Sequence, residues 1–148
     1  MSERENLTKE YKALQIQYAY YIMALAAASI GFSVNLSVGL KKDAVHIILG
    51  IAIALWMISI YCGLKYVKTI GISIGLNITA FDIAEGRSSQ YANNPQGKTL
   101  GMKITDAARN QLETKVKRYI VSQRYCLYFG VLLFLVWRLF IMMEWHLN

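Results

Sequence analysis

Three apolar stretches, residues 18–39, 44–64 and 125–145, are each long enough to cross a lipid bilayer. A helix of about 21 residues, rising about 1.5 Å per residue, covers the ~30 Å hydrocarbon core. The chain is 55% hydrophobic and contains a single proline, which agrees with long apolar helices. The sequence therefore predicts an all-α integral membrane protein with three transmembrane helices.

The segments outside these stretches are too short to form a second domain. They add up to about 85 residues in several pieces, too few for another large core. We therefore expect residues 1–148 to form a single membrane domain. The first 17 residues are mixed in charge, and no small-residue cleavage site follows the first apolar stretch. This pattern favours a retained first span over a cleaved signal peptide.

The distribution of charge predicts the orientation. The N-terminal tail and residues 65–124 together hold 13 of the 16 Lys and Arg residues, and three spans put these two segments on one face. The positive-inside rule makes that face cytoplasmic and the C-terminus external, as in a bacterial inner membrane. Eight of the ten tyrosines fall at the proposed cytoplasmic ends, the headgroup level that an amphipathic ring favours. They are Tyr18, Tyr20, Tyr21, Tyr61, Tyr66, Tyr119, Tyr125 and Tyr128.

Helical patterns continue beyond the spans on the cytoplasmic side. Residues 3–17, 65–85 and 105–124 are predicted helical extensions that together form a short stalk. The third is expected to begin with Thr105 as its N-cap and Asp106 in its first turn. Residues 86–104, rich in Ser, Asn and Gly, have the composition of a loop.

Residues 69–79 give a mixed signal. Isoleucine and leucine alternate there with small or polar residues, which is the period of a half-buried strand. The same residues place Gly63, Gly71 and Gly75 at multiples of four, which permits close helix contact. We interpret the segment as helix because a lone strand would leave its edges unpaired. A strand that pairs between subunits is the alternative.

The third span contains a charged residue, Arg138. Burying a guanidinium near the bilayer centre costs at least about 2.5 kcal/mol, and less towards either surface. Arg138 could join Asn35, Ser33 or Ser37 in a polar layer, structural or lining a pore. Alternatively, its side chain extends to the outer headgroups, a snorkelling arrangement.

Small residues form two rows on the first span. One row contains Ala27, Gly31, Asn35 and Gly39, and serines mark the opposite face. Two such faces suggest neighbours on both sides, including a second subunit. Ordinary packing within one chain explains them equally well.

Four basic residues precede the third span: Lys115, Lys117, Arg118 and Arg124. They are expected to set the topology and to attract anionic lipid. An anionic ligand is a further possibility, but no nucleic-acid-binding motif accompanies them, so nucleic acid is not expected as a partner.

No arrangement of residues typical of catalysis occurs, and we do not expect an enzyme. Residues 92–99 approximate a phosphate loop but have Ala92 where the first glycine belongs and no preceding strand, so no cofactor is expected. His46 and His146 have no Cys or carboxylate cluster beside them, so no metal site is expected. Cys62 and Cys126 lie near the reducing cytoplasm, where a disulfide is not expected.

Two functions fit the sequence. The chain could self-assemble into an oligomer that encloses a pore for ions or small solutes. Alternatively, it could anchor a cytoplasmic protein partner through its stalk. In general layout the chain resembles the small membrane effectors of bacterial toxin and phage-defence systems, which permeabilise the inner membrane; the likeness is one of architecture.

Overall fold

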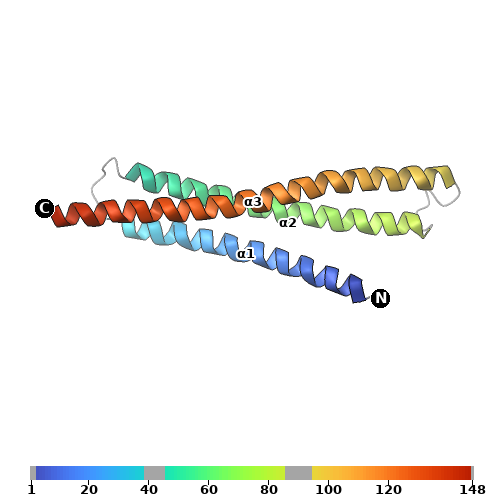
Figure 1. The fold of residues 1–148 in the computed structure, drawn as a ribbon, viewed down its shortest axis with the longest axis horizontal. Coiled ribbons are helices and arrows are strands. Elements are labelled where there is room, and N and C mark those ends of the chain that lie inside the picture. The colour runs from blue at the N-terminus through green and yellow to red at the C-terminus, as the bar shows by residue number, and fades with distance from the viewer. Residues whose placement is uncertain (1–2, 39–45, 86–94, 148) are drawn as a thin grey trace. The chain divides into compact units, whose positions relative to one another are not determined.

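The computed structural model describes residues 3–38, 46–85 and 95–147, and within them every secondary-structure element is an α-helix. Helix α1 covers Glu3–Ser37, α2 covers His46–Ala84 and α3 covers Pro95–Leu147, with lengths of 35, 39 and 53 residues (Figure 1). The segments Glu10–Ser37, His46–Ala84 and Gln96–Met143 are long and apolar enough to cross a membrane. The predicted three membrane-length helices are therefore present.

The helical interpretation of residues 69–79 is confirmed, because they lie inside α2. The predicted start of the third helix is wrong. Helix α3 begins at Pro95, where a proline lacks only an N–H that the helix leaves unpaired anyway. Thr105 is not an N-cap, since its hydroxyl donates to the carbonyl of Gly101 at 2.8 Å within α3. Residues 95–104 are thus helical rather than loop, and residues 86–94 lie outside the described residues.

The chain divides into two compact units. Unit 1 contains Met1–Leu64 and Ile120–Asn148, and unit 2 contains Lys65–Tyr119. The predicted extension 3–17 belongs to unit 1, and the extension 65–85 lies in unit 2. The predicted segment 105–124 is shared between them.

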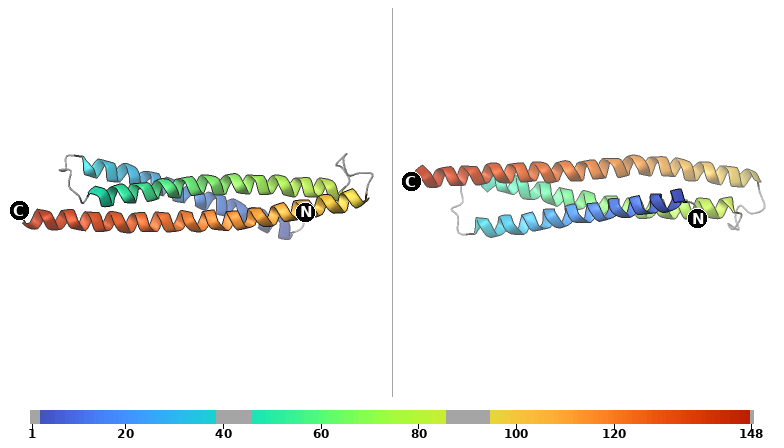
Figure 2. Two further views of the ribbon diagram at one scale, coloured as in Figure 1. Left: turned by 90° about the horizontal axis from the view of Figure 1, so that it is seen from above. Right: turned by 60° about the horizontal axis from the view of Figure 1, so that its bottom comes forward.

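Unit 1 is a bundle of three helical segments. Helix α1, the first half of α2 and the second half of α3 run alongside one another (Figures 1 and 2). Its core is formed by Ile22, Ala26, Trp56 and Leu127. Around the core pack Ile30, Ile53, Ile60 and Phe134. The rings of Trp56 and Phe134 lie 5.9 Å apart between centroids, and those of Phe134 and Trp137 lie 5.6 Å apart. All three helices therefore contribute to one aromatic and aliphatic core.

Two glycines allow the helices of unit 1 to approach closely. A Cβ atom added to Gly130 would lie 2.5 Å from Nε1 of Trp56, and one added to Gly63 would lie 2.5 Å from Nε2 of Gln123. Both distances are well inside van der Waals contact. Gly50, by contrast, has nothing within 4 Å of such an atom. Gly63 and Gly130 are therefore the positions at which packing requires a missing side chain.

Unit 2 is a pair of helical segments, the second half of α2 and the first half of α3. Ile83 and Thr105 are buried, and the Lys98 ammonium donates a hydrogen bond to the carbonyl of Ala84 at the end of α2. A cation is favoured there because the last carbonyls of a helix lack partners.

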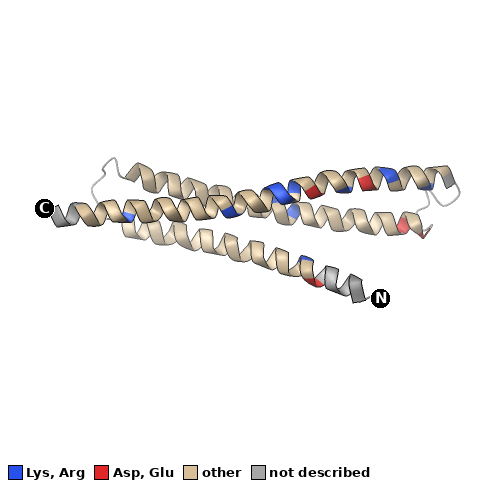
Figure 3. Ribbon diagram, viewed as in Figure 1, with Lys and Arg blue, Asp and Glu red and all other residues tan. Residues whose placement is uncertain are grey.

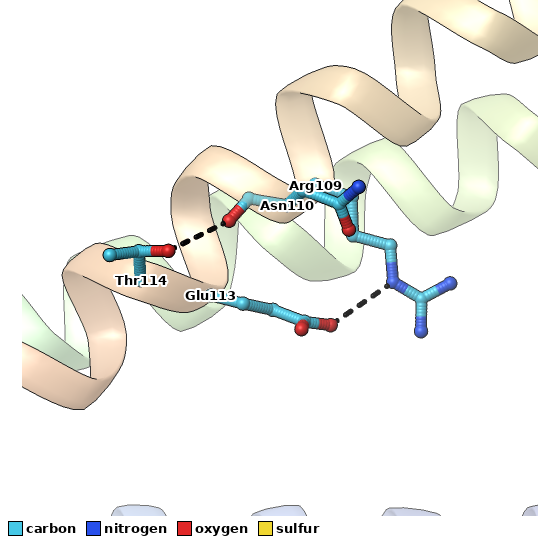
Figure 4. A network of polar contacts seen from close by, with 4 residues as sticks. All are labelled: Arg109, Asn110, Glu113 and Thr114. Carbon is cyan, nitrogen blue, oxygen red and sulfur yellow. Dashed lines mark hydrogen bonds and ion pairs between the residues drawn. The ribbon is translucent and has the colours of Figure 1, made fainter.

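The charged residues of α3 gather in its first half, whereas its second half is nearly free of them (Figure 3). Arg109 and Glu113 form an exposed ion pair of 3.5 Å one turn apart, beside a hydrogen bond from Thr114 to the carbonyl of Asn110 (Figure 4). Such exposed pairs contribute about 0.3–0.5 kcal/mol. The first half of α3 thus has a solvated face, and the second half is suited to lipid.

We expect Gly130→Ala to lower the free energy of unfolding by about 1–3 kcal/mol, because the rigid Trp56 ring must move aside. Gly50→Ala is the matched control in the same unit and should cause no loss. Unfolding of the detergent-solubilised protein, followed by helical circular dichroism, measures both. Equal stability of the two variants would contradict the close packing of α2 and α3.

Candidate functional site

The residues of the predicted polar layer differ in exposure and in the hydrogen bonds that the described structure shows. Ser33 is fully buried, Asn35 is exposed, and the Ser37 hydroxyl donates to the carbonyl of Val34 at 2.8 Å. Arg138 is half-buried, and no hydrogen bond or ion pair joins it to another described residue. Among the described residues, no hydrogen bond links Asn35 to Arg138, and the polar layer stays a prediction.

The small residues of α1 lie on its outer surface. Ala27, Gly31 and Asn35 are exposed, and a Cβ atom on Gly31 would meet nothing within 4 Å. Gly39 lies outside the described residues. Gly71 and Gly75 in unit 2 are likewise open. Of the glycines predicted for helix packing and described here, Gly63 is therefore the one in contact within the chain.

The four basic residues before the third span fall into different units. Lys115, Lys117 and Arg118 are exposed on unit 2. Arg124 belongs to unit 1, where its guanidinium carbon lies 5.1 Å from the centroid of the Tyr18 ring. A guanidinium over an aromatic face at this distance is attracted to the ring. Among the four, Arg124 therefore has a defined position against a neighbouring helix.

The sequence predictions missed Gln123, which links all three helices of unit 1. Its side chain is fully buried, and its Nε2 donates to the carbonyl of Ala19 in α1 at 3.2 Å. Its backbone carbonyl accepts a hydrogen bond of 2.8 Å from the Ser59 hydroxyl of α2. A buried residue whose side chain bonds to α1 and whose backbone carbonyl bonds to α2 sets the register of the bundle, since an apolar contact could slide.

A signal for Gln123 was present in the sequence. Along α3, alternating steps of three and four residues lead from Val116 to Trp137 and pass through Gln123 and Gly130. The full row is Val116, Ile120, Gln123, Leu127, Gly130, Phe134 and Trp137. This is the spacing of a seam that faces partner helices. A polar residue on that seam was the clue to a buried hydrogen bond.

No cluster of three or more His, Cys, Asp or Glu side chains that could hold a metal occurs among the described residues. Cys62 is buried and Cys126 half-buried, both as free thiols. The His46 ring meets the edge of Trp137 at 6.1 Å. Gly97, Lys98 and Thr99 of the phosphate-loop-like segment lie in the first turns of α3. Among the residues of this paragraph, the contact between helices is that of His46 in α2 with Trp137 in α3.

Comparison of the chain with protein-family models, with curated proteins and with solved structures gives no match.

We expect Gln123→Ala to lower the free energy of unfolding by about 1–3 kcal/mol, through a lost interhelical hydrogen bond and lost packing. Gln111→Ala removes the same side chain from an exposed position of α3 and should change stability by less than about 0.5 kcal/mol. Denaturant titration in detergent compares them. A Gln123→Ala variant as stable as wild type would show that the amide does not hold the bundle together.

Proposed function

We propose that this chain self-assembles in a membrane into an oligomer that encloses a pathway for ions or small solutes. The observation that supports this proposal most is the row of Ala27, Gly31 and Asn35 on the outer face of α1. This row lies within the predicted first span, so in a lone chain it would face lipid.

An amide facing hydrocarbon has no hydrogen-bond partner, and small residues leave a shallow surface that lipid tails fill poorly. Contact with the same face of a second copy removes both problems. Interhelical hydrogen bonds of this kind contribute about 0.6–2 kcal/mol, and small residues let two helix backbones approach closely. The residues exposed on α1 therefore support self-association through this helix.

A pathway would have to run between copies of the chain. The interior of unit 1 is filled by Trp56, Leu127 and their neighbours, with a glycine at the tightest contact. Asn35 and Arg138 lie outside this core and are the polar residues available to line a passage. A cationic guanidinium there would favour anions over cations.

In this proposal the chain sits in a bacterial inner membrane with its Lys- and Arg-rich end in the cytoplasm. Opening of the pore would dissipate ion gradients, as in the membrane effectors of toxin and phage-defence systems whose layout it resembles. Unit 2 would act as the cytoplasmic gate or sensor.

One observation favours a second candidate function, a membrane anchor for a cytoplasmic protein. Unit 2 exposes large apolar side chains that water does not favour, including Ile74, Ile78, Phe81, Leu100 and Ile104. A partner that covers them would be held at the membrane.

Dye-loaded vesicles containing the purified protein separate the two functions. We expect wild-type protein to release the dye, and Asn35→Leu and Arg138→Leu each to reduce the rate of release by about fivefold or more. Asn110→Leu, which alters an exposed asparagine of unit 2, is the control for Asn35 and should leak like wild type.

Vesicles that stay sealed with wild-type protein would contradict the pore. If such a protein also co-purifies with a soluble partner, and changes to Phe81 or Leu100 abolish the association, the anchor is favoured instead.

A further inference from the structure

An open groove of about 470 Å³ lies on unit 1 between α1 and α3. Its walls include Tyr11, Leu14, Tyr18 and Tyr21 from α1, and Ile120 and Arg124 from α3. These residues lie at the ends of the predicted spans, which begin at residues 18 and 125. The groove is therefore at the depth where lipid headgroups meet hydrocarbon.

The polar side chains of the groove are one guanidinium, tyrosine hydroxyls and the amides of Gln15 and Gln17. Among the described residues that line the groove, Arg124 is the charged one and none is a carboxylate, and no ion pair joins Arg124 to a described Asp or Glu. The Tyr18 ring holds the guanidinium from one side at 5.1 Å, which leaves its N–H groups free to bind an anion.

Tyr21 adds a second donor. Its phenolic oxygen accepts a hydrogen bond of 3.0 Å from Nε2 of Gln17, so its own O–H points elsewhere and can donate. Leu14 and Ile120 are the aliphatic residues of the groove, and both precede the predicted spans. One positive charge and a hydroxyl donor at the start of the predicted spans match the phosphodiester of an anionic phospholipid.

We propose that this groove binds an anionic phospholipid of the adjacent leaflet. Its phosphodiester lies against Arg124 and Tyr21, its headgroup faces Leu14 and Ile120 on the aqueous side, and its acyl chains continue into the hydrocarbon alongside the spans. The inference needs only that unit 1 sits in a bilayer, so it stands or falls separately from the proposed pore. It assigns specific lipid recognition to Arg124, whereas the other three basic residues act through general electrostatic attraction.

Native mass spectrometry of the full chain in detergent tests the site, with dioleoylphosphatidylglycerol and dioleoylphosphatidylcholine as probes. We expect wild-type protein to prefer phosphatidylglycerol by about fivefold, the effect of one well-placed basic residue. Arg124→Gln should remove most of this preference. Arg118→Gln removes the same charge from the same helix but from unit 2, and should keep it.

Three results would overturn the proposal. These are equal binding of the two lipids by wild-type protein, equal loss of the preference in the two arginine variants, and displacement of the lipid by excess inorganic phosphate, which would indicate a site for a soluble anion. Helical circular dichroism checks that each variant folds. If Arg124→Gln does not, Tyr18→Leu replaces it, because removal of the ring should also weaken the preference; an unchanged preference in that variant would likewise overturn the site.

Discussion

The hydrocarbon of a bilayer offers no hydrogen-bond partner to a peptide group, so a chain that crosses it must satisfy each N–H and C=O within itself. Helices of 35, 39 and 53 residues meet this requirement, because every interior peptide is paired along its own segment. Residues 69–79 lie beyond the second predicted span, and there the helix is favoured because a lone strand would leave its backbone groups unpaired. Once α2 is helical at Leu64, continuing the helix pairs each further peptide group locally.

Lipid is as apolar as the core of unit 1, so apolarity alone cannot select how the three helices pack. The specific contacts come from missing side chains and from one amide. Gly63 and Gly130 let side chains of neighbouring helices approach where a Cβ would collide. Gln123 then bonds to Ala19, and Ser59 bonds back to Gln123. The packing of unit 1 is therefore specified by a few small and polar residues within an otherwise apolar core.

The number of apolar helices and their helical character could be predicted from the sequence, because these features depend on one helix at a time. The three apolar stretches followed from length and hydropathy, and the helical character of residues 69–79 followed from the unpaired edges that a lone strand would have. The start of α3 was misplaced because Thr105 has the side chain of an N-cap, whereas its hydroxyl can equally bond back to Gly101 inside a helix. Gln123 and Gly130 were overlooked because their roles depend on Ala19 and Trp56, which are distant in sequence and come close only when the helices pack. The roles of Arg138 and Asn35 as pore residues stay predictions.

The central claim is that three helices cross a bilayer in succession, so that residues 96 and 148 face opposite sides. Single cysteines placed at Gln96 and Asn148, in a chain whose Cys62 and Cys126 are replaced, test it with a membrane-impermeant thiol reagent. In sealed inside-out vesicles the account predicts that the cysteine at 96 reacts at once and the cysteine at 148 reacts only after detergent is added. Reaction of both cysteines from the same side would contradict it.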